Sequence, residues 1–458
     1  MAACGPFDDW NYDAVALKFH WGLFAPEPAW CAVTVGAGRI PPGPLEHYDP
    51  SRVLLDWMGE QFARFGDIFS ATAFGTAIYA INDPAYAEHV LRRNWQNYRK
   101  GTAIKRIRLL LGNGLMASEG TFWKAQRRMI QPAFHRAAMA ALIPLMTAAS
   151  DRLLDGWMRA ARAHRSVNVT RDISLMVLET VLLAIFGEDY DELAPRFRML
   201  SEEAARDLRF AQDFRSLGTV VTNLAARRRA RGIDAADILG LLMKASDAQD
   251  GRPMTAVQLT SEVLTLIVAG HETTASTLNW LWFLLAQHPG AERRLEREAR
   301  HWPADGISTL DDLRGFPYSR QVIEETLRLY PAGWLMTRKA LADDRLGDYF
   351  VPAGTEIYIS PYFIQRHPGL WKNPDCFDPG RFDPGRAEHR PELAMMPFSA
   401  GPRNCIGEHF ARVEMQIHLI TVARQLHLRY DYIQMPELDI GVNLRSRHDF
   451  VMMPEAAA

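Results

Sequence analysis

The pattern of apolar and polar positions divides the chain into a short mixed segment, a long helical stretch and a region of small sheets. Apolar residues recur at helical spacing in Ser51–Phe65, and β-branched and aromatic residues fill Asp67–Ile81, which predicts a helix followed by a hairpin. From residue 83 to about residue 302 the periodicity is overwhelmingly helical. After Pro331, short β-type stretches alternate with turn residues. We therefore expect a mainly α fold with small β-sheets.

One predicted helix differs from the others because its middle is apolar on nearly all sides. It is expected to begin at Thr255, with Gln258 in capping-box order, and to end before His288–Pro289. Some thirty residues would span roughly 45 Å, enough to cross a domain. The apolar run is too short for a membrane span, because the polar residues HETT interrupt it. Polar groups inside a buried helix are costly, so HETT requires a structural or functional reason.

Proline-rich segments mark two irregular parts of the chain. Ile40–Pro44 is stiff and linker-like, so we expect residues 1–44 to form an irregular extension and residues 45–458 a single domain. A second Pro-rich loop, from Asn373 to Gly407, leads into the helical stretch EHFARVEMQIHLI. Internal repeats and low-complexity tracts are absent from the sequence.

Composition and charge exclude several classes of protein. Hydrophobic residues make up 48% of the chain and charged residues 23%, as in a globular protein with a large core. A net charge of -2 gives no reason to expect a nucleic-acid partner. The four cysteines are too irregularly spaced for a disulfide framework or a zinc motif, which favours a reducing cytoplasm. The N-terminal segment has no apolar run of signal or membrane-spanning length, so we expect a cytoplasmic monomer without a transmembrane anchor.

The strongest chemical signal is a single cysteine, Cys405, in the loop FSAGPRNCIG. It lies between Arg403 and Gly407, directly before a helical stretch. The helix dipole and free N–H groups at a helix N-terminus favour a thiolate, so this sulfur is suited to be a metal ligand or a nucleophile. The alternative is an ordinary buried cysteine, which is the more frequent environment of a lone cysteine.

This loop resembles the haem-binding loop of the cytochrome P450 family, FxxGxRxCxG. The defined positions are matched by Phe398, Gly401, Arg403, Cys405 and Gly407. The resemblance implies that Cys405 is the axial ligand of haem b (iron protoporphyrin IX), that Phe398 packs on the ligand side and that Arg403 pairs with a haem propionate. A thiolate pushes electron density toward iron and favours O–O cleavage, so a monooxygenase that uses dioxygen is implied.

AGHETT, at Ala269–Thr274, is similar to the oxygen-activation motif of the same family. The resemblance implies that Ala269 and Gly270 face the haem and that Gly270 leaves room for dioxygen. Glu272 and Thr273 would deliver protons to the buried site. The alternative is that the Thr273 hydroxyl only bonds back to a helical carbonyl.

EETLRLYP carries a candidate structural network. Glu325 and Arg328 are three residues apart, so they share one face of a helix. In the family this pair is buried, and the resemblance implies that Arg381 of FDPGRF completes a network that holds the cysteine loop.

WKAQR places Trp123 and Arg127 on one helical face at i, i+4 spacing. The resemblance assigns both to the haem propionates, together with Arg403. Arg338 joins them as an inference from its place in the first strand after the helix that bears Arg328.

The implied substrate pocket is largely apolar and suits a hydrophobic small molecule held by shape. Its expected lining residues are Leu266, Ala269, Trp334, Leu335 and Leu444. Basic residues between positions 100 and 108 are compatible with a carboxylate on the substrate, or with a solvated basic face. Fatty acids, terpenoids and polyketides all remain open as substrates.

The chain contains neither a flavin region nor clustered cysteines for an iron–sulfur centre. Electrons are therefore expected from a separate ferredoxin, supplied by an NAD(P)H-dependent ferredoxin reductase. We expect an acidic ferredoxin to dock near Lys124, Arg128 and Arg412. Two alternatives are a haem-thiolate sensor or carrier and a peroxide-using relative. Glu272 and Thr273 argue against both, because neither depends on that proton-delivering pair.

Overall fold

The computed structural model describes residues 39–201, 208–248, 251–303, 306–386, 389–431 and 435–457. Most of the expected N-terminal extension, residues 1–38, lies outside this described part. About 57% of the residues are helical and the strands form small sheets, so the expected mainly α fold is confirmed.

The helices and strands follow the order that the periodicity predicted. The helices are α1 Leu54–Phe65, α2 Pro84–Glu88, α3 Ile104–Leu111, α4 Gly120–Ile130, α5 Arg136–Arg162, α6 Val169–Phe186, α7 Tyr190–Phe197, α8 Leu208–Arg231, α9 Ile238–Lys244, α10 Ala256–Gln287, α11 Pro289–Ala299, α12 Pro317–Leu329, α13 Pro361–Ile364 and α14 Glu408–Ala423. The strands are β1 Ile68–Ala73, β2 Thr76–Ile81, β3 Tyr98–Lys100, β4 Val167–Asn168, β5 Met336–Ala340, β6 Asp344–Leu346, β7 Tyr349–Val351, β8 Glu356–Ile359, β9 Leu426–Arg429, β10 Leu438–Ile440, β11 Leu444–Ser446 and β12 Val451–Ala456.

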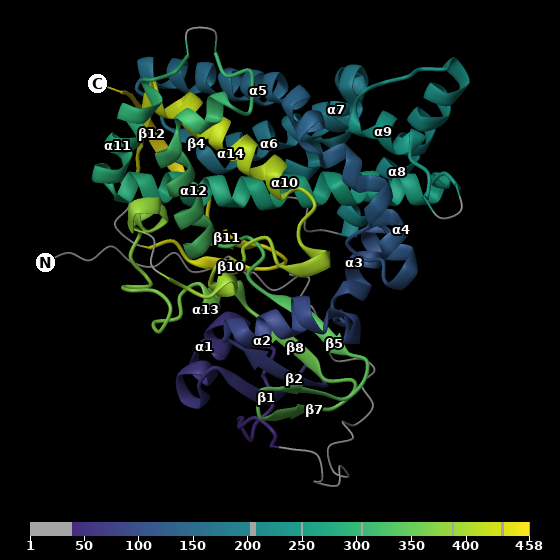
Figure 1. Cartoon of the computed structure of the whole chain (residues 1–458). Coiled ribbons are helices and arrows are strands. Elements are labelled where there is room, and N and C mark those ends of the chain that lie inside the picture. Colours follow the sequence, from purple (N-terminus) through teal and green to yellow (C-terminus); the bar gives the residue numbers. More distant parts are fainter. Residues whose placement is uncertain are drawn as a thin grey trace, which may run out of the picture.

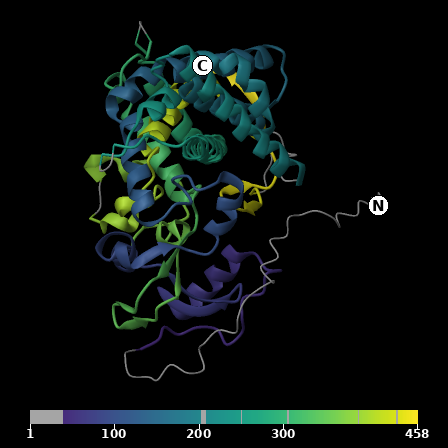
Figure 2. The ribbon, with the colours of Figure 1, turned by 90° about the vertical axis from the view of Figure 1, so that its right-hand side faces the viewer.

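The long helix α10 crosses the helical part of the molecule (Figure 1) and is seen end-on at its centre in Figure 2. The predicted capping box is present, because the Thr255 hydroxyl accepts from the Gln258 N–H and the Gln258 side chain accepts from the Thr255 N–H. The helix ends at His288, as predicted. Near its end, Trp280 stacks on Tyr330 at 4.0 Å between ring centroids, which joins α10 to α12.

The largest sheet lies at one end of the helical layer, beside α1 and α2 (Figure 1). Its strand order is β1-β2-β8-β5-β3, in which β2 and β8 are parallel and the other pairs antiparallel. The predicted β1–β2 hairpin is confirmed. Pairing of β3 with β5 sets Lys100 opposite Arg338, so two cationic side chains from distant parts of the sequence become neighbours.

Within the described residues, α5 is the one helix that is long and apolar enough to cross a membrane by length and composition. Its buried residues Met139, Ile143 and Trp157 belong to the main hydrophobic cluster, and the helix packs against α14 and α6. These contacts bury one side of the helix against the core.

Candidate functional site

The loop that carries Cys405 is folded tightly against the helical turn that follows α2. Gly401 has a φ of +72°, and a methyl group there would lie 2.0 Å from the Leu91 carbonyl oxygen, so only glycine fits. The Cys405 N–H donates to the Phe398 carbonyl at 2.9 Å, which closes the loop just before α14. The glycine of the motif therefore serves the backbone path of the loop.

Cys405 combines burial with an accessible surface. Burial raises the pKa of its thiol, while N–H groups of Gly407 and Glu408 and the charge of Arg127 lower that pKa by less. The residue nevertheless remains exposed. A thiol can be both enclosed by protein and accessible at its surface when the accessible side borders an internal space instead of bulk solvent. A metal ion in such a space would deprotonate the thiol, so the sulfur fits the iron of a haem.

The middle of α10 also keeps accessible surface where a central helix should have none. Residues 261–267 and 274–285 are buried, yet residues 268–270, Glu272 and Thr273 are only partly so. Because α14 continues directly from the cysteine loop and packs against α10, we infer that this surface borders the same enclosed space.

The other side of this turn of α10 faces α6. A methyl group on Gly270 would lie 3.2 Å from Val181, so the glycine permits the close approach of the two helices. That its small size also leaves room for dioxygen stays a prediction. His271 is buried and hydrogen-bonds the Ser174 hydroxyl at 2.9 Å, and burial lowers its pKa. This histidine is therefore part of the helix contact.

Glu272 and Thr273 have different partners. The Thr273 hydroxyl donates to the Ala269 carbonyl at 2.7 Å, the helical back-bond that was the alternative to a catalytic role. That bond uses the hydroxyl proton and leaves the oxygen able to accept. Glu272 instead accepts from the Asn443 side-chain amide at 2.9 Å. Asn443, in the turn between β10 and β11, was not indicated by the sequence.

A cluster of partly buried cations lies where the cofactor carboxylates are expected. Burial, together with the charge of Arg403, lowers the pKa of Arg338 to about 10 and the pKa of Lys100 to about 7. Arg403 is paired with Glu119 through both carboxylate oxygens, at 2.7 Å for one of them. The Arg403 Nε–H is buried and unpaired. One paired carboxylate among three cations leaves a positive excess, which a dicarboxylate such as haem would compensate.

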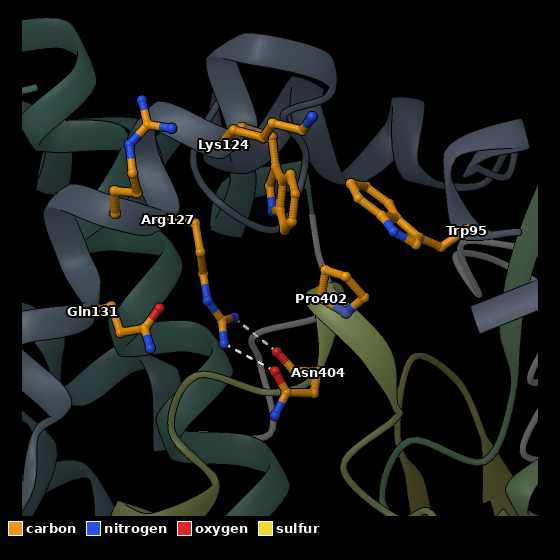
Figure 3. Close-up of a pocket in the computed structure, with 8 residues that line it drawn as sticks. Trp95, Lys124, Arg127, Gln131, Pro402 and Asn404 are labelled. Carbon is orange, nitrogen blue, oxygen red and sulfur yellow. Dashed lines mark hydrogen bonds between the residues drawn. The ribbon is translucent and has the colours of Figure 1, made fainter. Parts of the chain in front are cut away.

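Trp123 and Arg127, from one face of α4, take different positions. The Trp123 ring is buried and lies 4.9 Å from the Arg403 guanidinium carbon, next to the cation cluster. Arg127 donates to the Asn404 backbone carbonyl at 2.8 Å and to its side-chain oxygen at 2.9 Å (Figure 3). Arg127 therefore braces the residue before Cys405. Its expected contact with a propionate stays a prediction.

Glu325, Arg328 and Arg381 meet in a buried network, as the motif indicated. Arg328 donates to both Glu325 carboxylate oxygens at 2.7 and 2.8 Å, and the Arg381 Nε lies 3.2 Å from the same carboxylate. The remaining guanidinium N–H groups donate to backbone carbonyls, which belong to Gln365, Lys372, Asn373, Pro374 and Cys376. The network thus fixes a stretch of chain that has no regular structure of its own.

Gln365 is a fully buried bridge that the sequence did not reveal. Its amide donates to the carbonyls of Leu327 and Arg328, and its oxygen accepts from the Met396 N–H at 2.9 Å. Met396 lies just before Phe398, so this side chain connects the end of α12 to the start of the cysteine loop. No local pattern singles out such a glutamine.

The expected pocket residues divide into two groups. Ala269 and Leu335 keep accessible surface, whereas Leu266, Trp334 and Leu444 are buried. The Trp334 indole donates to the Gly441 carbonyl at 3.1 Å. Trp334 and Leu444 therefore support the apolar wall from behind and present little surface to an occupant.

A second buried acid lies on α10, at Glu262. It accepts from the Leu115 N–H at 2.8 Å, while its other oxygen has no partner. The Leu115 carbonyl in turn accepts from Lys100 at 2.8 Å, so Lys100 is not part of a solvated basic face. Burial raises the pKa of Glu262 to about 7.

An open hollow of about 420 Å³ lies outside the cysteine loop (Figure 3). Its lining residues are Trp95, Trp123, Lys124, Arg127, Arg128, Gln131, Pro402 and Asn404. Two of the three cations expected to dock a ferredoxin, Lys124 and Arg128, are therefore on its rim. The third, Arg412, is partly buried, is ion-paired with Glu324 and Glu408 and lines a separate hollow, so its part in docking stays a prediction.

Comparisons with known proteins agree with this geometry. The family model described as Cytochrome P450 matches residues 43–216 and 193–441. Cyclooctatin synthase of Streptomyces melanosporofaciens is 30% identical over 387 residues, covering 80% of this chain and 83% of that protein. Carotene epsilon-monooxygenase, chloroplastic, of Arabidopsis thaliana is 28% identical over 415 residues, covering 82% and 76%. The solved structure described as retinoic acid bound cyanobacterial CYP120A1 has a TM-score of 0.81 at 23% identity, covers 92% of this chain and 100% of its own, and thus shares the fold.

Replacing Arg328 by Met should destabilise the protein by about 3–5 kcal/mol, because Glu325 would remain buried without its main counter-ion. Denaturant unfolding measures the loss. Arg386→Met is the matched control, since Arg386 forms an exposed pair with Asp378 and should cost below about 1 kcal/mol. Equal losses in the two variants would contradict a stabilising role for the buried network.

Glu262→Gln should stabilise the protein in a pH-dependent way. The carboxyl keeps its proton to about pH 7 when folded but loses it near 4.5 when unfolded, so the free energy of unfolding falls as pH rises between these values. The variant should gain about 3 kcal/mol at pH 8 and about half of that at pH 5.5.

Denaturant unfolding at the two pH values tests this expectation. Glu119→Gln is the control of opposite sign, because Arg403 holds the pKa of Glu119 below its ordinary value and the variant should lose stability at pH 8. A gain for Glu262→Gln that is independent of pH would contradict the raised pKa.

Proposed function

The chain belongs to the cytochrome P450 family and is a haem-thiolate monooxygenase, and we propose that it hydroxylates or epoxidises a hydrophobic small molecule with electrons from a separate ferredoxin. The observation that carries the proposal is the state of Cys405. Its sulfur lies within the protein, receives N–H groups at the start of α14 and still has accessible surface. When bound, the haem supplies the activation of dioxygen.

The residues of this chain would hold the haem b at two ends. The Cys405 Sγ would bind the iron. Arg338, Arg403 and Lys100 would neutralise the two propionate carboxylates of the haem. The Arg403 Nε–H has no partner in the protein and would donate to one of these carboxylates. Glu272 and Thr273 would move protons from solvent to the reacting site: the carboxylate would take up each proton and pass it to the hydroxyl oxygen, while the hydroxyl releases its own proton from the Ala269 carbonyl toward the site.

A hydrophobic substrate is supported by the apolar wall and by two relatives. Ala269 and Leu335 offer accessible apolar surface, and Trp334 and Leu444 stiffen the wall behind it. The relatives' names include carotene and retinoic acid, which are long hydrophobic molecules. Such compounds are the first to screen through the spin-state change of the ferric protein. We also propose that the protein is a monomer in the cytoplasm; the unpaired Cys376 and Cys405 of the described chain support the compartment alone.

The proposed ferredoxin would dock at the hollow beside the cysteine loop. Lys124 is exposed there and lies 5.4 Å above the Trp95 ring. Arg127 and Asn404 also line the hollow, where Arg127 donates to the carbonyl of Asn404, the residue before Cys405. An acidic ferredoxin, itself reduced by an NAD(P)H-dependent reductase, would thus dock close to Cys405, and electrons would have a short path to the thiolate.

The reduced protein with carbon monoxide should show the Soret band of a thiolate ligand, and Cys405→Ser should lose it. Cys376→Ser is the matched control, because Cys376 is exposed and lies outside the loop, so this variant should keep the band. Absence of the band in the parent protein would overturn the assignment of Cys405 as the ligand.

Lys124→Glu should slow reduction by an acidic ferredoxin by about tenfold at low salt, with the difference disappearing at high salt. Arg64→Glu, a charge reversal on α1, should leave the rate unchanged. Stopped-flow reduction over a salt series measures both. If the two variants respond alike, the docking site lies elsewhere.

A further inference from the structure

The turn between β10 and β11 is bound to the acid of the AGHETT motif. The Asn443 amide donates to the Glu272 carboxylate at 2.9 Å, although the two residues are 171 positions apart. Asn443 is buried, while the preceding Val442 is 65% exposed. The exposed and the buried residue are neighbours in the chain, so the Asn443 amide holds Glu272 close to the solvent-exposed tip of the hairpin.

This turn has little freedom to move. The carbonyl of Leu444, next to Asn443, accepts from the Ser276 hydroxyl at 2.7 Å and from the Trp280 indole at 3.2 Å, both on α10. The Leu444 N–H donates to the Ala332 carbonyl at 3.1 Å. On the other side of Asn443, the Gly441 carbonyl accepts from the Trp334 indole at 3.1 Å. Asn443 is thus presented to Glu272 by a backbone held on both sides, which is the condition for a preorganised contact.

The chemistry of the contact is directional. A neutral amide N–H is a donor and keeps a carboxylate in place without neutralising it, so Glu272 remains able to take up a proton on its other oxygen. A positive residue at this position would instead pair with the carboxylate and oppose its protonation.

We propose that Asn443 is a positioning residue of the proton relay. Its amide holds the Glu272 carboxylate in a fixed position between the exposed tip of the hairpin and the Thr273 hydroxyl. One O–H bond forms on Glu272 when a proton arrives from the solvent side, and the same bond breaks when the proton leaves toward Thr273. This role rests on the proposed monooxygenase function of the same site.

The test compares two isosteric variants, Asn443→Asp and Asn443→Leu. The first replaces the donor with a second carboxylate and the second removes the donor. A misplaced Glu272 carboxylate should lower the product formed per electron by about tenfold, which is less than the roughly 10²–10⁴-fold that general acid catalysis itself contributes, and should raise the share of hydrogen peroxide released to solvent. The solvent deuterium isotope effect on turnover should also change.

Val442→Ala is the matched control, because it alters the same turn without touching Glu272, and it should leave the peroxide share and the isotope effect as in the parent. The proposal is overturned if both Asn443 variants match this control.

A second readout does not depend on turnover. Asn443→Asp should lower the thermal unfolding midpoint by about 2–4 °C. The double variant Asn443→Asp with Glu272→Gln exchanges donor and acceptor and should restore the midpoint. It should not restore product formation, because glutamine cannot carry the proton. Additive losses in the midpoint would overturn the contact itself.

A parent protein without the thiolate Soret band would end the proposed function, while the unfolding midpoints would still decide the Asn443–Glu272 contact. A parent with the band and with normal turnover, whose Asn443 variants match Val442→Ala, would end only the positioning role.

Discussion

The buried Glu325 carboxylate holds together the segment of the chain that leads to the cysteine. It accepts from Arg328, from Arg381 and from the Asp378 N–H at 2.9 Å. Removing these charges from water costs several kcal/mol for each ion, and the cost is offset only when the remaining donors also find partners. The partners are backbone carbonyls of residues 365–376, so these hydrogen bonds favour a single backbone conformation of this irregular stretch. Gln365, at the start of this stretch, accepts from the Met396 N–H and so connects the stretch to the cysteine loop.

The cations Lys100, Arg338 and Arg403, at the other side of the loop, have fewer carboxylate partners than positive charges. The Glu325 network has a partner for each guanidinium, whereas Lys100, Arg338 and Arg403 share Glu119, and the Arg403 Nε–H stays unpaired. Burial, and to a smaller extent repulsion by neighbouring cations, lowers the pKa values of Lys100 and Arg338. A satisfied ion network stabilises the fold, while an excess of one charge in a buried place is the property of a binding site. This difference separates structural arginines from those available to the cofactor.

Features that depend on neighbouring residues were predictable from the sequence, and those that depend on distant partners were not. The limits of α10 follow from Thr255, Gln258 and His288, all of which act locally, and the Glu325 network follows from motif spacing and family resemblance. The insertion of β8 between β2 and β5 joins segments far apart in the sequence, which periodicity cannot reveal. Partners such as Glu119, Gln365 and Asn443 are single polar residues without a pattern. The ion pair of Arg412 belongs to the same group, because its partner Glu324 lies 88 positions away.

The core helix packing connects these two ends of the site. Tyr330, two residues after Arg328, stacks on Trp280, and the Trp280 indole donates to the Leu444 carbonyl beside Asn443. The ion network that places the cysteine loop and the hairpin that touches Glu272 are therefore fixed to the same aromatic pair. Because packed interiors deform little, a change at either end is transmitted through few contacts. The positions of the thiolate and of the proton-carrying acid are thus set by one continuous piece of core, at a distance from the reacting atoms.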